Sequence, residues 1–263
     1  MSRQNYYAQR KRRQREKVEE ELIGQLVLRE RQIQPRIGGR KLHRMLGQEF
    51  QEAGIEIGRD RFFEVLRAGN LLLAPRRAAR PHTTDSRHYL PVFTNQIKGL
   101  ELKGANQVWV SDITYLRSTE SFMYLALISD KWSRKIVGYH CGDNLEVEGC
   151  LKALEVALED LPEWAKPIHH SDRGSQYCSH EYVNRLMERQ LGVSMTERDH
   201  CAENALAERI NGILKSEYGL DLEFKTKEQV RKAVDQAVYL YNTRRLHTSL
   251  GYRVPQEVHS RAA

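Results

Sequence analysis

The chain has 263 residues, of which 40% are hydrophobic and 29% are charged, and its formal net charge is +7. This length allows one large domain or two smaller ones with buried cores. No apolar run approaches the roughly 20 residues that a membrane span needs, and the first residues lack the apolar segment of a secretory leader. We therefore expect a soluble, cytoplasmic protein with no membrane partner.

The charge is unevenly distributed. Residues 1–90 contain 20 Lys and Arg against 11 Asp and Glu, a net charge of +9, which leaves −2 for residues 91–263. A basic front half suits a module that binds a polyanion, although a solubilising surface has the same composition. The cysteines form no closely spaced pair, so reduced thiols are expected at all four positions. These are Cys141, Cys150, Cys178 and Cys201.

The first 75 residues carry helical patterns. Val18, Leu22 and Leu26 recur at four-residue spacing and predict a helix over 9–30. Two shorter helices follow, separated by a break at Ala53-Gly54, and the second begins near Gly58. Their apolar stripes are Leu42, Leu46 and Phe50 in one, and Phe62, Phe63 and Leu66 in the other. Two short helices joined by a glycine-containing turn are typical of a helix-turn-helix unit.

A helix-turn-helix unit places its second helix in the major groove of DNA. We therefore expect DNA contacts from basic side chains of this region and of the segment after it. The candidates are Arg40, Lys41, Arg59, Arg61, Arg76 and Arg77. A helical hairpin with a charged exterior is the alternative. Residues 76–100 are rich in Arg, Pro and Thr, which predicts a basic linker that follows phosphates or, alternatively, a solvated spacer.

From Asn106 onward the pattern changes to short β-rich runs. Residues 107–116, 122–130 and 135–142 predict an antiparallel meander. An amphipathic helix over 146–161 follows, then a strand at 167–170, a helix at 180–189, a strand at 193–195 and a helix at 205–218. A last helix starts at Thr226, which forms a capping-box pattern with Gln229. This order predicts an α/β fold with one mixed sheet covered by helices.

Three carboxylates occupy unusual places in this α/β region. Asp112 lies within an apolar strand, where burial of its charge costs several kcal/mol unless a cation or ion pair compensates. Asp172 follows the strand at 167–170 and precedes a glycine. Glu208 lies on the helix 205–218 and shares a face with Gly212 and Lys215. Alone, each residue has a structural explanation that is favoured: a frayed strand end or salt bridge for Asp112, a surface turn for Asp172 and a solvated helix face for Glu208.

Together the three carboxylates predict a metal site. Mg²⁺ prefers oxygen ligands from a few carboxylates together with water and substrate phosphates. Two such ions can activate an attacking hydroxyl and stabilise the departing oxygen of a phosphodiester. Lys215, Arg173 and Gln176 are candidate contacts to DNA phosphates.

Several longer motifs now point to one family. NQVWVSDITYL, FMYLALISDKWSRKIVGY, HHSDRGSQYCS, ENALAERINGILKSE and YNTRRLHTSLGYRVPQEV occur in this order and spacing. They resemble the second-frame transposase of the "insertion sequence three" family of bacterial mobile elements, whose core is similar to retroviral integrase. RIGGRKL and TTDSRH match as well, so the resemblance covers roughly the whole chain.

The resemblance implies an RNase H-like mixed five-stranded sheet flanked by helices and preceded by an all-α helix-turn-helix region. It implies a catalytic triad of Asp112, Asp172 and Glu208, which would hold Mg²⁺ or Mn²⁺, with two ions expected. The implied reaction is cleavage and strand transfer at inverted-repeat ends. The implied partners are end-repeat and target DNA, further copies of this chain in a dimer or larger multimer, and an upstream-frame protein or fusion. The protein would be associated with the bacterial nucleoid.

The expected domains are 1–75 for DNA binding, 76–100 as linker, 101–222 as catalytic core and 223–263 as a helical extension. Two alternatives remain open: an end-binding repressor without catalysis, and a nonspecific RNase H-like nuclease. The histidines and cysteines around Asp172 and Glu208 fit no usual zinc spacing. We instead expect His170 to pack or orient near the site, and Cys178 and Cys201 to be buried thiols.

Overall fold

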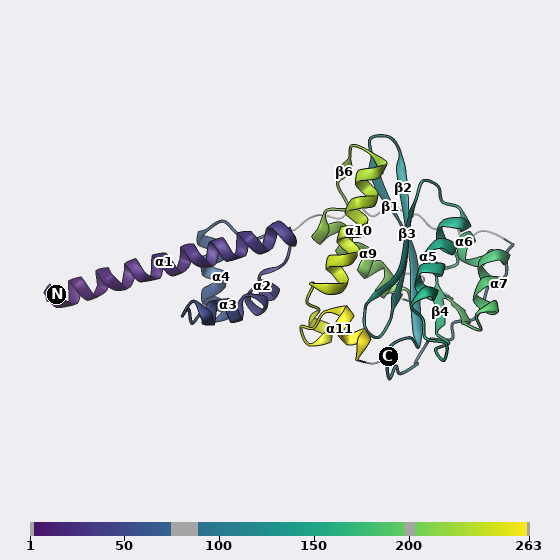
Figure 1. Cartoon of the computed structure of the whole chain (residues 1–263), viewed down its shortest axis with the longest axis horizontal. Coiled ribbons are helices and arrows are strands. Elements are labelled where there is room, and N and C mark those ends of the chain that lie inside the picture. Colours follow the sequence, from purple (N-terminus) through teal and green to yellow (C-terminus); the bar gives the residue numbers. More distant parts are fainter. Residues whose placement is uncertain (1–2, 75–88, 198–202, 262–263) are drawn as a thin grey trace. The chain divides into compact units, whose positions relative to one another are not determined.

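The computed structural model describes residues 3–74, 89–197 and 203–261 (Figure 1). The chain divides into two compact units, residues 1–77 and residues 78–263. Arg76, Arg77 and Cys201 lie outside the described residues.

The described part of the first unit is helical: α1 Arg3–Ile33, α2 Gly39–Met45, α3 Gly47–Glu52 and α4 Arg59–Ala68. The stripe Leu42, Leu46 and Phe50 is buried, as predicted, although the helix is interrupted at Leu46 between α2 and α3. The chain then turns at Gly54, whose φ of 68° lies in the left-handed region that favours glycine. The predicted start of the following helix near Gly58 is confirmed, because Gly58 is the N-cap of α4.

The predicted apolar stripe of α1 is wrong by one position. Ile23 and Val27 are fully buried, whereas Leu22 and Leu26 are half-buried and Val18 is 64% exposed. Only the second half of α1 packs against the small core that α2, α3 and α4 form. Val18 precedes this packed part, so the four-residue spacing that includes it does not mark a buried face.

The second unit contains the mixed sheet that the sequence predicted. Its strands are β1 Val108–Ser118, β2 Phe122–Asp130, β3 Ile136–Gly142, β4 Ile168–Ser171 and β5 Gly192–Met195, in the order β3-β2-β1-β4-β5. β1, β2 and β3 form the predicted antiparallel meander, and β4 and β5 run parallel to β1. A short strand, β6 Glu223–Phe224, pairs with the far end of β1 and was not predicted.

Helices cover both faces of this sheet (Figure 1). α5 Val147–Glu159, α6 Ser175–Cys178 and α7 His180–Glu188 pack on the face that includes Trp109 and Ile128. α9 Ala205–Tyr218 and α10 Lys227–Thr243 pack on the face that includes Leu125 and Leu127. Even-numbered positions Val108 and Val110 of β1 contact Ala207 of α9 in a small cluster. Strand alternation therefore directs Asp112 towards the α9 face.

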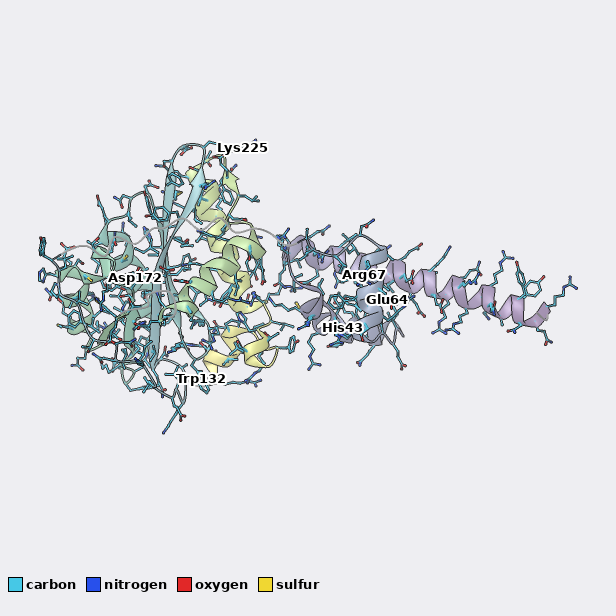
Figure 2. The ribbon with its side chains drawn as sticks, turned by 180° about the vertical axis from the view of Figure 1, so that it is seen from behind. His43, Glu64, Arg67, Trp132, Asp172 and Lys225 are labelled. Carbon is cyan, nitrogen blue, oxygen red and sulfur yellow. The ribbon has the colours of Figure 1, made fainter. Side chains whose placement is uncertain are left out.

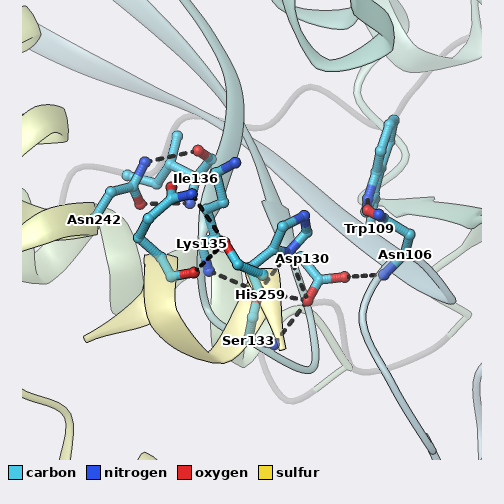
Figure 3. A network of polar contacts seen from close by, with 10 residues as sticks. Asn106, Trp109, Asp130, Ser133, Lys135, Ile136, Asn242 and His259 are labelled. Atoms are coloured by element: carbon cyan, nitrogen blue, oxygen red, sulfur yellow. Dashed lines mark hydrogen bonds and ion pairs between the residues drawn. The ribbon is translucent and has the colours of Figure 1, made fainter. Parts of the chain in front are cut away.

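The C-terminal segment packs onto the core through polar contacts (Figure 3). It contains a 3-10 turn η1 Thr248–Leu250 and the short helix α11 Pro255–Ser260. His259 of α11 lies 3.0 Å from the hydroxyl of Ser133, which donates to the buried carboxylate of Asp130 at 2.6 Å. Asn242 binds both the N–H and the C=O of Ile136 at 2.9 Å. These contacts fix α10 and α11 to the turn between β2 and β3.

Burial alone would raise the pKa of Asp130, but the nearby His259 and the hydrogen bonds from Ser133 and from the backbone N–H of Asn106 outweigh it and hold the pKa below its usual value. The Asp130 carboxylate is therefore a charged anchor for this corner of the fold. Separately, none of the helices within 3–74, 89–197 and 203–261 has the length and apolar character needed to cross a membrane.

Candidate active site

Asp112 and Asp172 lie side by side because of the strand register. β1 and β4 pair in parallel with Val110 opposite His170, so two residues further on Asp112 faces Asp172, just past the end of β4. Neighbouring strands are about 4.8 Å apart, which brings two carboxylates of like charge into close proximity. Figure 2 labels Asp172 among the elements of the second unit.

The surroundings of Asp112 raise its pKa to about 7. Burial is the largest cause, and the negative charges of Asp172 and Glu208 add to it. Two hydrogen bonds act in the opposite direction: Asn211 Nδ2 donates to Oδ2 at 2.8 Å, and the N–H of Ile113 donates to Oδ1 at 2.9 Å. Asp112 is thus a half-buried carboxylate that lacks a full counter-charge near neutral pH.

The helix α9 supplies the other side chains of the site. Asn204, its N-cap residue, donates through Nδ2 to the carbonyl of Ser111 at 2.9 Å, and Asn211 bonds to Asp112 as described. Lys215 is half-buried, and burial lowers its pKa while the charge of Asp112 acts to raise it. Residues 204, 208, 211 and 215 follow helical spacing, so they share the face of α9 that meets β1.

The carboxylates around Asp112 provide only part of the set of ligands that a divalent cation needs. Asp112 and Asp172 form an adjacent pair of oxygen ligands whose mutual repulsion a cation would relieve. Glu208 is exposed, and its charge is the weakest of the influences on Asp112. Within the described parts of the chain, no three His, Cys, Asp or Glu side chains are close enough to hold one metal ion together. The pair fits the ion, and Glu208 borders the same site without joining a three-residue cluster.

A buried polar cluster supports β1 and β4 behind the carboxylates. The imidazole Nε2 of His169 lies 2.6 Å from the hydroxyl of Ser111 and 2.9 Å from that of Tyr182. Burial lowers the pKa of His169 to about 3, so the ring is neutral, and its Nε2 lies within hydrogen-bond distance of both hydroxyls. Tyr177 is buried beside it, with rings 5.9 Å apart, and burial raises the pKa of its phenol. The cluster holds Ser111, which directly precedes Asp112, and His169, three residues before Asp172.

Two residues predicted to contact phosphates instead bind backbone carbonyls in this structure. Arg173 Nε donates to the carbonyl of Thr196 at 2.6 Å, and Gln176 Nε2 donates to that of Leu145 at 2.8 Å. Both contacts shape the loop that carries Asp172. Their direct contact with DNA stays a prediction, as does that of Lys215.

Gly174 matters for the space it leaves beside Asp172 rather than for its backbone conformation. Its φ of −63° is accessible to every residue, so the turn needs no glycine for conformation. A Cβ at this position would instead lie 3.1 Å from Asp172 Oδ1, the oxygen that accepts the N–H of Gly174 at 3.0 Å. The glycine therefore provides space beside the carboxylate.

His170 and Cys178 are both buried near the site. His170 Nδ1 lies 2.9 Å from the hydroxyl of Ser194, and burial lowers the pKa of His170 to about 4. Cys178 lies 3.6 Å from the sulfur of Met195, and burial raises the pKa of its thiol to about 11. Both side chains are thus uncharged packing groups, as expected from the sequence, and Cys141 and Cys150 are likewise free buried thiols.

Four residues of the first unit that were predicted to contact DNA lie on described helices, and their contact with DNA stays a prediction. Arg59 bonds to Asp60, and Arg61 forms ion pairs with Glu20 at 2.6 Å and with Glu64 at 3.0 Å. Arg40 is exposed on α2 and Lys41 is half-buried beside it. DNA would have to compete with those carboxylates for Arg61.

Two partners of β1, Asn211 and Asn204, share the predicted face of Glu208 but were not predicted as site residues. Both are buried, at 5% and 3% exposure. Their spacing from Glu208, three residues after it and four before it, was a usable signal, because asparagines within an apolar helix face need polar partners. The strand that supplies those partners could not be known without the packing of α9 on β1.

Comparison with known proteins agrees with this geometry. Two family profiles, each described as "Integrase core domain", match residues 103–201 and 189–255. The "Insertion element IS600 uncharacterized 31 kDa protein" of Shigella sonnei is 37% identical over 79% of this chain and 77% of its own length. The "Transposase for insertion sequence element IS629" of the same organism is 34% identical over 84% of this chain and 72% of its own length.

A solved structure shares the fold. It is the "CryoEM structure of simian T-cell lymphotropic virus intasome in complex with PP2A regulatory subunit B56 gamma", with a TM-score of 0.52, 16% identity, and coverage of 84% of this chain and 74% of the other. The sheet order and the flanking helices thus define an RNase H-like fold of the integrase type. The integrase core matches and the IS629 relative indicate a polynucleotidyl transferase. The chain belongs to the IS3 family of insertion-sequence transposases.

Proposed function

We propose that this transposase cleaves and joins DNA strands at the inverted-repeat ends of an insertion sequence, and that Asp112, Asp172 and Glu208 form its catalytic site. The adjacency of Asp112 and Asp172, with the pKa of Asp112 raised to about 7, is the observation that carries the proposal. Two neighbouring carboxylates repel each other when both are ionised, and a bound hard cation would relieve that repulsion.

The site residues have distinct proposed roles. Asp112 and Asp172 would hold Mg²⁺ or Mn²⁺, with two ions expected and Glu208 as the ligand that completes the second position. When bound, these ions would supply activation of the attacking hydroxyl and stabilisation of the leaving oxygen. Asn211 orients the Asp112 carboxylate through its 2.8 Å hydrogen bond. Lys215, on the same helix face, would pair with a DNA phosphate.

The first unit would bind the end repeat through α4, with Arg59 and Arg61 near its start and Arg40 and Lys41 on α2. Two ends must meet for transposition, so a symmetric dimer or larger multimer on DNA is part of the proposal. An upstream-frame protein or fusion and association with the nucleoid are further expectations. Sedimentation of the protein with and without paired end-repeat duplexes measures the multimer directly.

The test of the catalytic proposal uses labelled duplexes that carry the end repeats found beside the coding region. The wild type with Mg²⁺ is expected to produce nicked and joined strands, and Glu208→Gln and Asp172→Asn are expected to bind DNA but form no joined product. Glu181→Gln changes an exposed glutamate of α7 and is the matched control. Joined product from Glu208→Gln at the wild-type rate removes Glu208 from the site.

A second measurement tests metal binding without catalysis. Mg²⁺ that binds the folded protein raises its unfolding temperature. The rise is expected in the wild type and in Glu181→Gln, and it is expected to be lost in Asp112→Asn. An equal rise in all three proteins would place the ion elsewhere.

A further inference from the structure

A short segment before β1, residues 95–97, packs against β1 and α9 and bonds to β5; we call it the strap. Its anchor is Ile97, which is 5% exposed and packs with Val108 and Val110 of β1 and Ala207 of α9. The sequence suggested only a linker for this part of the chain. The strap is instead part of the core that α9 and β1 share.

Asn95 joins the two described residues that flank 198–202. Its Nδ2 donates to Glu203 Oε2 at 3.1 Å, and its backbone N–H donates to Glu197 Oε1 at 3.2 Å. Glu203 Oε2 also accepts the backbone N–H of Glu197. The orientation of Asn95 is itself fixed, because its Oδ1 accepts the N–H of Ile97 at 3.1 Å. Asn95, through its backbone N–H and its side-chain amide, thus ties Glu197, which follows β5, to Glu203, which directly precedes the N-cap of α9.

Gln96 extends the same connection to β4. Its N–H donates to the hydroxyl of Ser194 at 2.9 Å, and its Nε2 donates to the carbonyl of Val193 at 2.8 Å. Ser194 in turn contacts His170, two residues before Asp172. Through Ser194 and His170, the strap is therefore connected to β4, the strand that ends just before Asp172.

The other branch leads to Glu208. Glu203 directly precedes Asn204, the N-cap of α9, whose side chain holds the carbonyl of Ser111 beside Asp112. The carbonyl of Asn204 accepts the N–H of Glu208 at 3.3 Å, a long hydrogen bond. Contacts from outside the helix also hold this first turn. Asn95, through Glu203, supplies one of them.

We propose that Asn95 is a positioning residue for strand transfer, which holds the first turn of α9 so that Glu208 stays beside the Asp112–Asp172 pair. The proposal rests on the proposed role of Glu208. It assigns no direct contact between Asn95 and DNA or metal. Asn95 acts through the carboxylate of Glu203, and its loss loosens the helix start that carries Glu208.

The decisive variant is Asn95→Asp, which keeps the shape and the acceptor for Ile97 but replaces the donor to Glu203 with a like charge. Like charges at hydrogen-bond distance repel. We expect strand transfer at saturating DNA to fall about tenfold or more, with KM for the end duplex within about twofold of wild type. In the metal-free protein, hydrogen exchange of the amides at 205–208 should become about tenfold faster.

A compensating change separates positioning from general damage. In the double variant Asn95→Asp with Glu203→Gln, the amide introduced at position 203 can donate to the carboxylate introduced at position 95, while its oxygen accepts the N–H of Glu197. The double variant is expected to recover strand transfer to within about threefold of wild type and to restore slow exchange at 205–208. The single variant Glu203→Gln completes the double-mutant cycle. Asn184→Asp, at an exposed position of α7, is the matched control with wild-type behaviour in both assays.

The outcomes are distinguishable. The proposal is overturned if Asn95→Asp transfers strands and exchanges like Asn184→Asp, or if the double variant is no better than Asn95→Asp. If wild type makes no joined strands at all, the proposed function fails, while the exchange measurement still decides whether Asn95 holds the start of α9. Faster exchange that spreads over the whole catalytic unit also overturns the proposal, since it indicates a loss of global stability.

Discussion

Asp112 destabilises the folded chain near neutral pH, and the sign follows from its pKa. Folding raises that pKa to about 7, so the folded state holds the proton more tightly than the unfolded state does. Below about pH 4 both states are protonated and the residue has no net effect. As pH rises from about 4 to 7 the unfolded state loses its proton first, and the folded state loses stability.

Asp112→Asn is therefore expected to stabilise the metal-free protein at pH 8, on the order of 2 kcal/mol, because it removes the buried charge but keeps an acceptor for Asn211. Urea unfolding between pH 4.5 and 8 measures the effect, and the advantage should shrink towards the acid end. Asp160→Asn, at an exposed helix end, should show no such trend. An advantage that grows as pH falls contradicts the assigned sign.

Gly174→Ala tests the space beside Asp172. The added methyl would lie 3.1 Å from Asp172 Oδ1 and 3.2 Å from Gln176 Oε1, closer than ordinary contacts, so the carboxylate must move. We expect strand transfer to fall about tenfold while the free energy of unfolding changes by less than about 1 kcal/mol, since φ at this position suits alanine. Gly212→Ala, where a Cβ meets nothing within 4 Å, serves as the comparison for folding. Unchanged transfer in Gly174→Ala would show that Asp172 tolerates the displacement.

At the scale of elements, the catalytic sheet depends on the close approach of α5 to β3. A Cβ on Gly138 of β3 would lie 2.2 Å from the carbonyl of Ala153 and 2.8 Å from the Cβ of Ala157. Neither is the end of a flexible side chain, so α5 would have to move away from the sheet. Gly138→Ala is expected to destabilise the protein by about 3 kcal/mol or more, measured by chemical unfolding.

Gly149→Ala, on α5 itself, is the matched control. There a Cβ meets only His140 at 3.8 Å, an ordinary contact. Replacing a helical glycine by alanine is expected to stabilise the protein by about 0.5–1 kcal/mol. Similar effects of the two substitutions would mean that the α5–β3 interface adapts more readily than its packing indicates.

Some elements were predictable because their local patterns carry the information. α9 spans residues 205–218 as predicted, since Asn204 and Gly219 delimit it and Gly219 adopts a φ of 76°. The N-cap Thr226 accepts the N–H of Gln229 as predicted, although the Gln229 side chain reaches the N–H of Lys225 rather than that of the cap. α6 and β6 were missed, because four and two residues are too short to show a period.

The candidate site was predictable as residues but not as geometry. Asp112 was noticeable because an apolar strand rarely carries a charge. Its position next to Asp172 depends on the register of β1 and β4, which pair across more than fifty residues of intervening chain. The contacts of Arg173 and of Asn95 depend on packing between loops in the same way. Such long-range pairings leave no periodic pattern in the sequence.

At the scale of the whole molecule, each unit has its own hydrophobic core, with Phe62 buried in the first and Trp109 in the second. The structure divides the chain at Arg77, and residues 223–261 pack on the catalytic sheet through Val230, Val234 and Tyr241. Independent folding of the two units follows from this arrangement, because buried apolar surface is the main source of their stability.

Truncation at two places tests this division and the importance of the strap together. A fragment of residues 89–263 retains the strap, and we expect it to unfold cooperatively at a temperature within a few degrees of the second unit in the full chain. A fragment of residues 101–263 starts at the predicted boundary of the catalytic core but lacks Asn95, Gln96 and Ile97. It loses a side chain that is 5% exposed and the hydrogen bonds to Ser194 and Val193.

We expect the free energy of unfolding of the shorter fragment to be lower by about 3 kcal/mol, because it lacks one buried isoleucine and several buried hydrogen bonds. Differential scanning calorimetry compares the two fragments, and end-repeat binding should be absent from both because the first unit is missing. A fragment of residues 89–263 with Ile97→Val restricts the change to one methyl group and should lose only about 1 kcal/mol. Equal unfolding temperatures for the two fragments would show that the strap lies on the core without stabilising it.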